Sequence, residues 1–218
     1  MRKRRLKKTV AGIMAIALIL TGMPQMYKEV NAHTKENKLS TVKMVCSTGN
    51  ITAVVTEGGD LYCWGVNNYG QAENGTRENQ YTPVKVLSNV RSVSLEENTS
   101  VAVTEDGDLY CWGYNYCGQV GNGNTENQYT PVKVLSNVRS VSLSQCVSAA
   151  IAENGDLYCW GYNNYGQVGN GTAVNQYTPV KVLSNVRSVS LEENTSAAVT
   201  EDGDLYCWGD NYYGEVGN

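Results

Sequence analysis

The sequence predicts an all-β protein, a β-propeller built from 48-residue blades of four strands each. The four tryptophans, at positions 64, 112, 160 and 208, follow one another at intervals of 48 residues. The segment NQYTPVKVLSNVRSVSL recurs unchanged at 79–95, 127–143 and 175–191. The repeats are rich in Val, Tyr, Gly, Asn, Ser and Thr, which favour strands and tight turns. A fixed period near fifty is typical of a propeller or a solenoid, and the solenoid is the alternative with usually shorter repeats.

Residues 1–32 have the three-part layout of a secretory signal peptide. MRKRRLKK carries six basic residues, TVAGIMAIALIL is apolar, and Val30-Asn31-Ala32 fits a cleavage site. The apolar run is short for a stable span of the bilayer, and an uncleaved anchor is the alternative. We therefore expect a secreted or cell-surface chain that begins near His33, with 33–41 as a short linker and no membrane association after cleavage.

The charge of the exported part disfavours nucleic acid as a partner. The whole chain has 17 Lys+Arg and 21 Asp+Glu, a net charge of −4. Residues 1–32 hold seven of the basic groups and one of the acidic groups, so the remainder has 10 basic and 20 acidic groups and a net charge of −10. Because nucleic-acid binding needs a basic surface that neutralises phosphates, we predict that this chain binds none.

Each repeat is predicted to contain four strands. The predicted blades are 42–89, 90–137, 138–185 and an incomplete 186–218. In the second blade the strands are Val90–Leu95, Ser100–Thr104, Asp108–Gly113 and Pro131–Leu135. A proline at the head of the fourth strand suits an edge strand, where a missing N–H costs little.

The turn between the second and third strands carries the same kind of residue pair in every blade. The pairs are Gly58-Gly59, Asp106-Gly107, Asn154-Gly155 and Asp202-Gly203. Such pairs tolerate positive φ at both residues, as a two-residue type I′ hairpin turn requires. The sequence therefore predicts a type I′ turn at each of the four positions.

The repeated pattern resembles a known family. G-D-L-Y-C-W-G-x-N-x-x-G-Q-V-G-N-G, followed by T-P-V, V-x-x-V and S-x-A-V-T-x-D-G, is similar to the regulator of chromosome condensation repeat over nearly all of 42–218. The resemblance implies a propeller that has seven blades in closed members of the family. About 3.7 blades are present, so an open arc is expected. Since an open arc exposes strand edges, we expect either the N-terminal part of a longer protein or a ring closed by self-association.

The chain also departs from the family pattern between the first and second strands. The family usually has a glycine there and, three residues later, a histidine. Those positions hold Glu96 and Thr99, Ser144 and Val147, and Glu192 and Thr195. The single histidine, His33, lies outside the repeats. A family role that depends on this histidine is therefore not expected. Nucleotide exchange on a small nuclear GTPase is not expected either, because the chain is predicted to be exported and acidic.

Four of the seven cysteines, Cys63, Cys111, Cys159 and Cys207, occupy one repeated position before the tryptophan. Alternation along a strand places Leu and Cys on one face and Tyr and Trp on the other. Neighbouring blades lie about 10 Å apart, beyond the Cα separation of about 4.4–6.8 Å that a disulfide spans. We therefore predict that these cysteines are small buried residues.

The remaining cysteines, Cys46, Cys117 and Cys146, are not repeated, and they replace Ser, Tyr and Asn of the other blades. Cys117 lies in a loop and is predicted to be the free, reactive thiol. No Cys-x-x-Cys pair is present and no histidine lies near a cysteine, so no metal site is predicted. The redox state of the seven thiols stays open at this point.

Strand directions assign the links between first and second strands and the long loops after each tryptophan to one face of the blades. Long loops on a rigid scaffold often carry function, and tyrosine is favoured at interfaces. The candidate binding residues are Tyr69, Tyr114, Tyr116, Tyr162, Tyr165, Tyr212, Glu96, Glu97, Glu192 and Glu193. Alternatively, the tyrosines pack against neighbouring blades and the charges are ordinary surface groups. Lys43, Arg91, Arg139 and Arg187 begin the first strands, so a basic mouth is expected at the opposite face.

No catalytic arrangement is recognisable in the sequence. It has no Ser-His-Asp or Cys-His set and no phosphate-binding glycine loop with a lysine. Catalytic carboxylate pairs need different environments, whereas repeats give each pair the same one. We predict a non-catalytic exported scaffold that uses no cofactor and binds a protein partner through the loops of one face. The alternatives are recognition of cell-wall or host polysaccharide by the same loops, or an N-terminal fragment of a larger enzyme or surface protein.

Overall fold

A computed structural model of the chain describes residue 39 and residues 41–217. The predicted signal peptide, 1–32, and most of the predicted linker lie outside this part. The described residues form fifteen strands, and no helix among them is long and apolar enough to cross a membrane. The strands are β1 (Val42–Thr48), β2 (Ile51–Thr56), β3 (Leu61–Gly65), β4 (Gln80–Leu87), β5 (Val90–Glu96), β6 (Thr99–Thr104), β7 (Leu109–Gly113), β8 (Gln128–Leu135), β9 (Val138–Leu143), β10 (Val147–Ala152), β11 (Leu157–Gly161), β12 (Gln176–Leu183), β13 (Val186–Leu191), β14 (Thr195–Thr200) and β15 (Leu205–Gly209).

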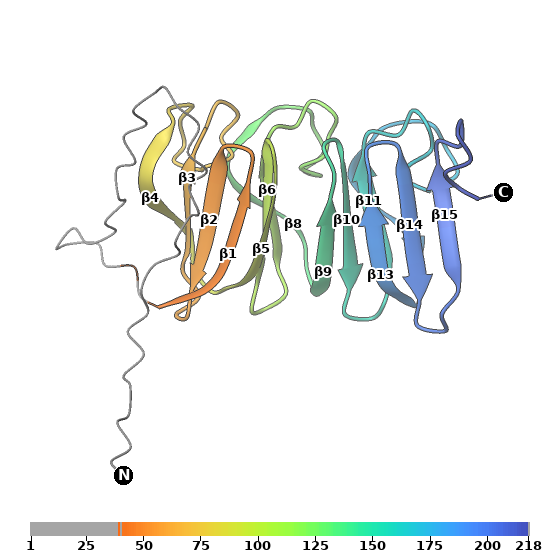
Figure 1. Cartoon of the computed structure of the whole chain (residues 1–218), viewed down its shortest axis with the longest axis horizontal. Coiled ribbons are helices and arrows are strands. Elements are labelled where there is room, and N and C mark those ends of the chain that lie inside the picture. Colours follow the sequence, from red (N-terminus) through yellow and green to blue (C-terminus); the bar gives the residue numbers. More distant parts are fainter. Residues whose placement is uncertain (1–38, 40, 218) are drawn as a thin grey trace, which may run out of the picture. The chain divides into compact units, whose positions relative to one another are not determined.

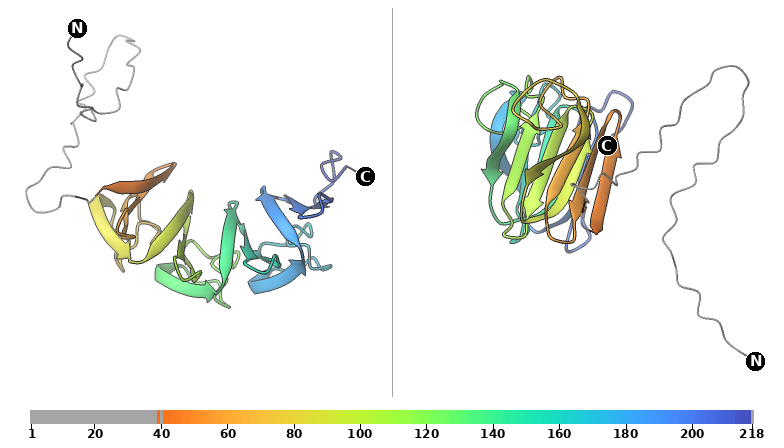
Figure 2. Two further views of the ribbon diagram at one scale, coloured as in Figure 1. Left: turned by 90° about the horizontal axis from the view of Figure 1, so that it is seen from below. Right: turned by 90° about the vertical axis from the view of Figure 1, so that its left-hand side faces the viewer.

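These strands form four antiparallel sheets in which consecutive strands pair. The sheets, which we call blades 1 to 4, are β1-β2-β3-β4, β5-β6-β7-β8, β9-β10-β11-β12 and β13-β14-β15. The blades stand side by side (Figure 1) and follow one another along an open arc (Figure 2, left). The prediction of an all-β propeller built from four-stranded blades in an open arc is confirmed.

The joints between blades are built from the two faces of the repeated Leu-Tyr-Cys-Trp segment. Leu157 and Cys159 of β11 are buried in one apolar cluster, and the partly buried Trp208 of blade 4 packs against that cluster. Trp160, the next residue of β11, is buried in a different cluster with Cys111 of blade 2. The predicted alternation is confirmed, and it explains why both faces of an inner blade are apolar: each face packs against a different neighbour.

One backbone carbonyl in each long loop of blades 1 to 3 accepts two hydrogen bonds from side chains of the next blade. The carbonyl oxygen of Gln119 accepts hydrogen bonds from Trp160 Nε1 and from Ser148 Oγ, both at 2.8 Å. The carbonyls of Gln71 and Gln167 accept the same pair of bonds from blades 2 and 4. Because a buried indole N–H needs a partner, these bonds fix how closely a loop approaches the neighbouring tryptophan.

The fourth strands of blades 1 to 3 are longer than predicted. In blade 2 it begins at Gln128 and not at Pro131. Cys111 pairs with Val132, whereas Gly113 pairs with Gln128, so the proline lies in a bulge of β8. Strand β8 pairs only with β7, and the proline lies in the bulge between paired residues. Its missing N–H therefore removes no hydrogen bond between the strands. The edge position was predicted correctly, and the start of the strand was wrong.

The predicted type I′ turns are also wrong. Gly107 has a φ of 80°, but Asp106 is not among the residues with positive φ. Gly107 N donates to Thr104 O and Thr104 N donates to Asp108 O, both at 3.0 Å. This is the geometry of a three-residue loop, a type I turn followed by a left-handed glycine. The Asp-Gly pair suits both turns, so the number of residues between the paired strand ends decides which one forms.

Candidate binding face

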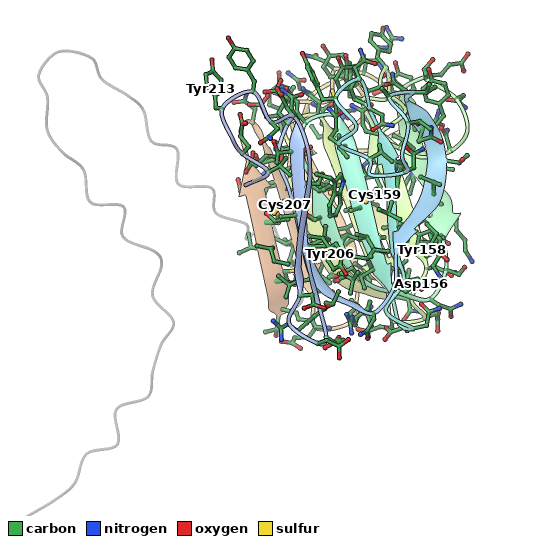
Figure 3. All side chains as sticks on the ribbon, turned by 90° about the vertical axis from the view of Figure 1, so that its right-hand side faces the viewer. Asp156, Tyr158, Cys159, Tyr206, Cys207 and Tyr213 are labelled. Carbon is green, nitrogen blue, oxygen red and sulfur yellow. The ribbon has the colours of Figure 1, made fainter. Side chains whose placement is uncertain are left out.

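The links between first and second strands and the long loops after third strands meet at one end of the blades, which we call the upper face. Figure 3 shows Tyr213, from the last long loop, at this end and Asp156 at the opposite end. Hydrogen bonds join each loop to the next link. Gln119 Nε2 donates to Gln145 O at 3.2 Å, and Gln167 Nε2 donates to Glu193 O at 3.3 Å. The upper face is therefore continuous from blade to blade.

A buried asparagine organises each of the long loops of blades 1 to 3, although these loops have no regular structure. Asn115 is fully buried, and its Oδ1 accepts a hydrogen bond from Val120 N at 2.9 Å. Its Nδ2 donates to Glu126 O at 3.0 Å and to Asn122 Oδ1 at 3.1 Å. Asn67 and Asn163 are equally buried and make the corresponding bonds. These contacts make the loops a fixed support for their exposed side chains.

A hollow of about 240 Å³ opens at the links of blades 2, 3 and 4. Three acidic side chains line it, Glu96 from blade 2 with Glu192 and Glu193 from blade 4. The other lining residues are Leu143, Ser144, Gln145 and Leu191. The structure thus brings three of the four candidate glutamates together, whereas the exposed Glu97 is not part of the lining.

The composition of the hollow reflects a departure of blade 3 from the repeat. Blades 2 and 4 carry Glu-Glu-Asn at 96–98 and 192–194, and blade 3 carries Ser-Gln-Cys at 144–146. Ser144 is shorter than the glutamate at its position in the neighbours, and it is buried in the floor of the lining. Carboxylates from both sides therefore face a position where blade 3 has none.

The arrangement is suited to binding a cation carried by a larger molecule. Carboxylates at neighbouring positions form strong, short hydrogen bonds with the guanidinium of arginine or the ammonium of lysine. The hollow is smaller than a typical pocket for a drug-sized ligand, about 300–1,000 Å³. Among the described residues, no group of three or more His, Cys, Asp and Glu side chains is arranged to hold a metal ion.

The candidate tyrosines lie around the upper face in separate groups, and none of them lines the hollow. The ring centroids are 5.0 Å apart for Tyr69 and Tyr114, 5.0 Å for Tyr114 and Tyr116, 6.3 Å for Tyr162 and Tyr165, and 4.8 Å for Tyr212 and Tyr213. The side chains of Tyr116, Tyr165 and Tyr212 are 65%, 50% and 80% exposed. These three rings are exposed enough to contact a partner. Tyr69, Tyr114 and Tyr162 are half-buried and pack against neighbouring tyrosine rings.

Three of the four repeated cysteines are buried thiols, as predicted, and for Cys207 the prediction is wrong. Cys63, Cys111 and Cys159 are fully buried, and Cys207 is half-buried. Figure 3 shows Cys159 and Cys207 within the strands of their blades. Burial raises the pKa of the Cys159 thiol to about 12 and also raises the pKa of Cys63 and Cys111. Such thiols are poor nucleophiles because the thiolate is the reactive form.

Two of the three unrepeated cysteines form a pair that the sequence reasoning missed. The sulfur atoms of Cys117 and Cys146 are 3.0 Å apart and hydrogen-bonded. Cys117 is a free thiol, as predicted, but its contact with a second free thiol was not predicted. The signal was present in the sequence, since both residues replace a repeated residue, but their proximity depends on how a loop of blade 2 meets a link of blade 3.

Three of the four cations expected at the opposite face pair with acidic side chains of the neighbouring blade. Lys43 pairs with Glu105 at 3.1 Å and Arg139 pairs with Glu201 at 3.3 Å. Arg91 lies 3.6 Å from Glu153 in the same manner. Each pair joins the first strand of one blade to the turn of the next, so these cations serve the joints between blades.

Comparisons with known proteins give the following matches. A family model described as RCC1-like domain matches residues 20–218. The human WBSCR16 structure has a TM-score of 0.68 and 22% identity, and the match covers 77% of this chain and 47% of that one. The structure of Kap60 bound to yeast RCC1 (Prp20) has a TM-score of 0.67 and 24% identity, and the match covers 82% of this chain and 45% of that one. The structure of Prp20p from Saccharomyces cerevisiae has a TM-score of 0.64 and 24% identity, and the match covers 72% of this chain and 43% of that one.

The chain thus spans less than half the length of each of these three structures. No curated protein matches the chain in sequence.

Proposed function

Because the chain belongs to the RCC1-like domain family, we propose that it is a non-catalytic propeller scaffold that binds a protein partner through its upper face. The acidic hollow between blades 2 and 4 carries this proposal. It is lined by Glu96, Glu192 and Glu193, and the long loops of blades 2 and 3 on the same face are held by buried hydrogen bonds. A lysine or arginine side chain of the partner fits its size and charge.

Relatives with the same fold support a protein as the partner. Yeast RCC1 (Prp20) was solved bound to Kap60, and Prp20p from Saccharomyces cerevisiae is described with its binding to Gsp1p and histones. The exposed rings of Tyr116, Tyr165 and Tyr212 add contact area to the upper face, which agrees with the enrichment of tyrosine at protein interfaces.

The proposed place of action is outside the cell, in secreted form or at the cell surface. The support is the layout of residues 1–32, which is that of a signal peptide. The N-terminal sequence of the chain recovered from the culture medium is expected to begin near His33. Recovery only from cells, with residues 1–32 still attached, would contradict export.

Neutralising the hollow is expected to weaken partner binding at least about tenfold. The variant combines Glu96→Gln, Glu192→Gln and Glu193→Gln, which keep the shape and remove the charges. Tenfold corresponds to about 1.4 kcal/mol, less than the usual worth of a hydrogen bond to a charged group. The measurement is affinity capture from extracellular material, followed by titration of the captured protein against both chains.

Glu97→Gln is the matched control, because Glu97 lies beside Glu96 but outside the lining of the hollow. It is expected to bind as the unaltered chain does. Equal binding by the triple variant, or recovery of a polysaccharide in place of a protein, is the result that contradicts the proposed function.

A further inference from the structure

Cys117 and Cys146 lie in different blades and touch each other at the upper face. Cys117 belongs to the long loop of blade 2, and Cys146 belongs to the link between β9 and β10 of blade 3. Their sulfur atoms are 3.0 Å apart, whereas the bond of a disulfide is about 2.05 Å long. A shift of about 1 Å in side chains on a loop and a link therefore brings the two sulfurs to bonding distance.

Both cysteines are exceptions within near-identical repeats. The position of Cys117 is occupied by Tyr69 in blade 1 and Tyr165 in blade 3. The position of Cys146 is occupied by asparagine in blades 2 and 4, at 98 and 194. The two departures from the repeat thus fall on two residues that touch each other, which unrelated substitutions would rarely do. The sequence therefore supports the pair in addition to the distance between the sulfur atoms.

We propose that Cys117 and Cys146 are a site of disulfide formation that cross-links blade 2 to blade 3. The oxidant is a disulfide of the glutathione class. The thiolate of Cys117 attacks one of its sulfur atoms, which forms a mixed disulfide and releases one thiolate. Cys146, after losing its proton, attacks Cys117 Sγ and releases the second thiolate. The two cysteines lose two electrons and two protons, and the oxidant becomes two thiols.

The chemistry of the two thiols agrees with these roles. The hydrogen-bonded thiol of Cys146 lowers the pKa of Cys117 to about 7, against a partial opposing effect of burial. The lowered pKa favours the thiolate of Cys117, and both side chains are only half-buried, so a small disulfide can reach them. The pKa of Cys146 is raised by the same hydrogen bond and by burial, which suits the second, resolving thiol.

The other five cysteines are poorly placed for the same reaction. Cys207 holds the repeated position one blade spacing, roughly 10 Å, from Cys159. Cys63, Cys111 and Cys159 are fully buried. Cys46 and Cys63 both pair with Ala53 on opposite sides of β2, so they lie two strand spacings apart, roughly 10 Å. The proposal is therefore specific for one pair among the seven thiols.

Cross-linking would fix the wall of the acidic hollow. Gln145, next to Cys146, lines the hollow, and Cys117 follows Tyr116 in the loop of blade 2. The disulfide would hold this link and this loop together in addition to the hydrogen bond from Gln119 Nε2 to Gln145 O. The cross-link does not depend on the proposed function, since it concerns the chain alone.

The test is oxidation of the purified chain in glutathione buffers of increasing oxidised fraction, followed by alkylation and peptide mass spectrometry. We expect a peptide pair joined through Cys117 and Cys146 as the first and main cross-link. We also expect a melting temperature about 5–10 °C higher, because a bridge between residues 29 apart constrains the unfolded chain. The rate of formation should rise with pH through about 7 and level off above about 8.

Two sets of variants keep the test decisive. Cys117→Tyr combined with Cys146→Asn restores the residues of the other blades, so it is expected to fold and to lose both the cross-link and the thermal shift. Cys46→Ser, which introduces the residue of the other blades at an unpaired thiol, is expected to change neither. A pair that stays reduced when Cys46 is already oxidised, or a main cross-link between other cysteines, overturns the proposal.

Discussion

Replacing Trp160 by alanine is expected to lower the free energy of unfolding by about 3–5 kcal/mol, the range measured for large aromatic residues removed from a core. Trp160 is 1% exposed and packs with Val120, Val138 and Cys111. Its Nε1 donates to the carbonyl of Gln119 at 2.8 Å. The substitution leaves a cavity at the joint between blades 2 and 3 and removes one of the two hydrogen bonds to that carbonyl.

The matched control is Trp64→Ala. Trp64 has the same place in β3 that Trp160 has in β11, but it is half-buried. In the described part of the chain no blade precedes blade 1, so no loop carbonyl accepts a hydrogen bond from the indole N–H of Trp64. We expect a loss of about 1 kcal/mol. The measurement is urea unfolding followed by circular dichroism, and equal losses in the two variants would contradict the account of the joints.

Removing the charge of Glu73 is expected to stabilise the chain above neutral pH. Glu73 lies in the long loop of blade 1, and burial raises the pKa of its carboxyl from 4.5 to about 7. The folded chain therefore holds this proton more tightly than the unfolded chain. Stability is unaffected below pH 4.5, falls between about 4.5 and 7, and stays reduced above 7. Because the side chain is only half-buried, the cost is about 1 kcal/mol and not the full value of the shift.

Glu73 also has a strained backbone, which allows the two effects to be separated. Its φ is 49°, and the other blades have Gly121 and Gly169 at this position. A Cβ on Gly121 would lie 2.6 Å from Trp160 Nε1, so glycine fits the close approach of the next tryptophan. Glu73→Gln is expected to gain about 1 kcal/mol at pH 8 and nothing at pH 4. Glu73→Gly is expected to gain about 1 kcal/mol more at both pH values.

Unfolding midpoints at pH 4 and pH 8 test both variants. The prediction is wrong if the gain of Glu73→Gln is the same at the two pH values, because the carboxyl would then have the same pKa in the folded and unfolded chain.

Much of what repeats could be predicted from the sequence, because each copy shows the same pattern of apolar and polar residues. The alternation of Leu, Tyr, Cys and Trp was enough to predict which side chains share a face and why the cysteines are buried. The turn at Asp106-Gly107 was not predictable in detail, since the pair suits two turn types and the register of β6 and β7 decides between them. The bulge at Pro131 likewise depends on pairing with β7.

The features of the candidate site that do not repeat needed the structure. Glu96 and Glu192 are 96 positions apart in sequence, and only the arc of blades shows that they face one hollow across Ser144. The contact between Cys117 and Cys146 also crosses a joint between blades. In both cases the sequence signal is a departure of blade 3 or blade 2 from its sister blades, and its meaning depends on which loop meets which link.

The central claim is that the partner binds at the upper face around residues 144–146, where blade 3 has Ser-Gln-Cys in place of Glu-Glu-Asn. Amide hydrogen exchange of the chain, alone and saturated with the captured protein, tests it most directly. The account predicts slower exchange in the links 96–99, 144–147 and 192–195 and no change in the lower turns at 105–107 and 153–155. Protection confined to the lower turns, with the three links unchanged, would contradict it.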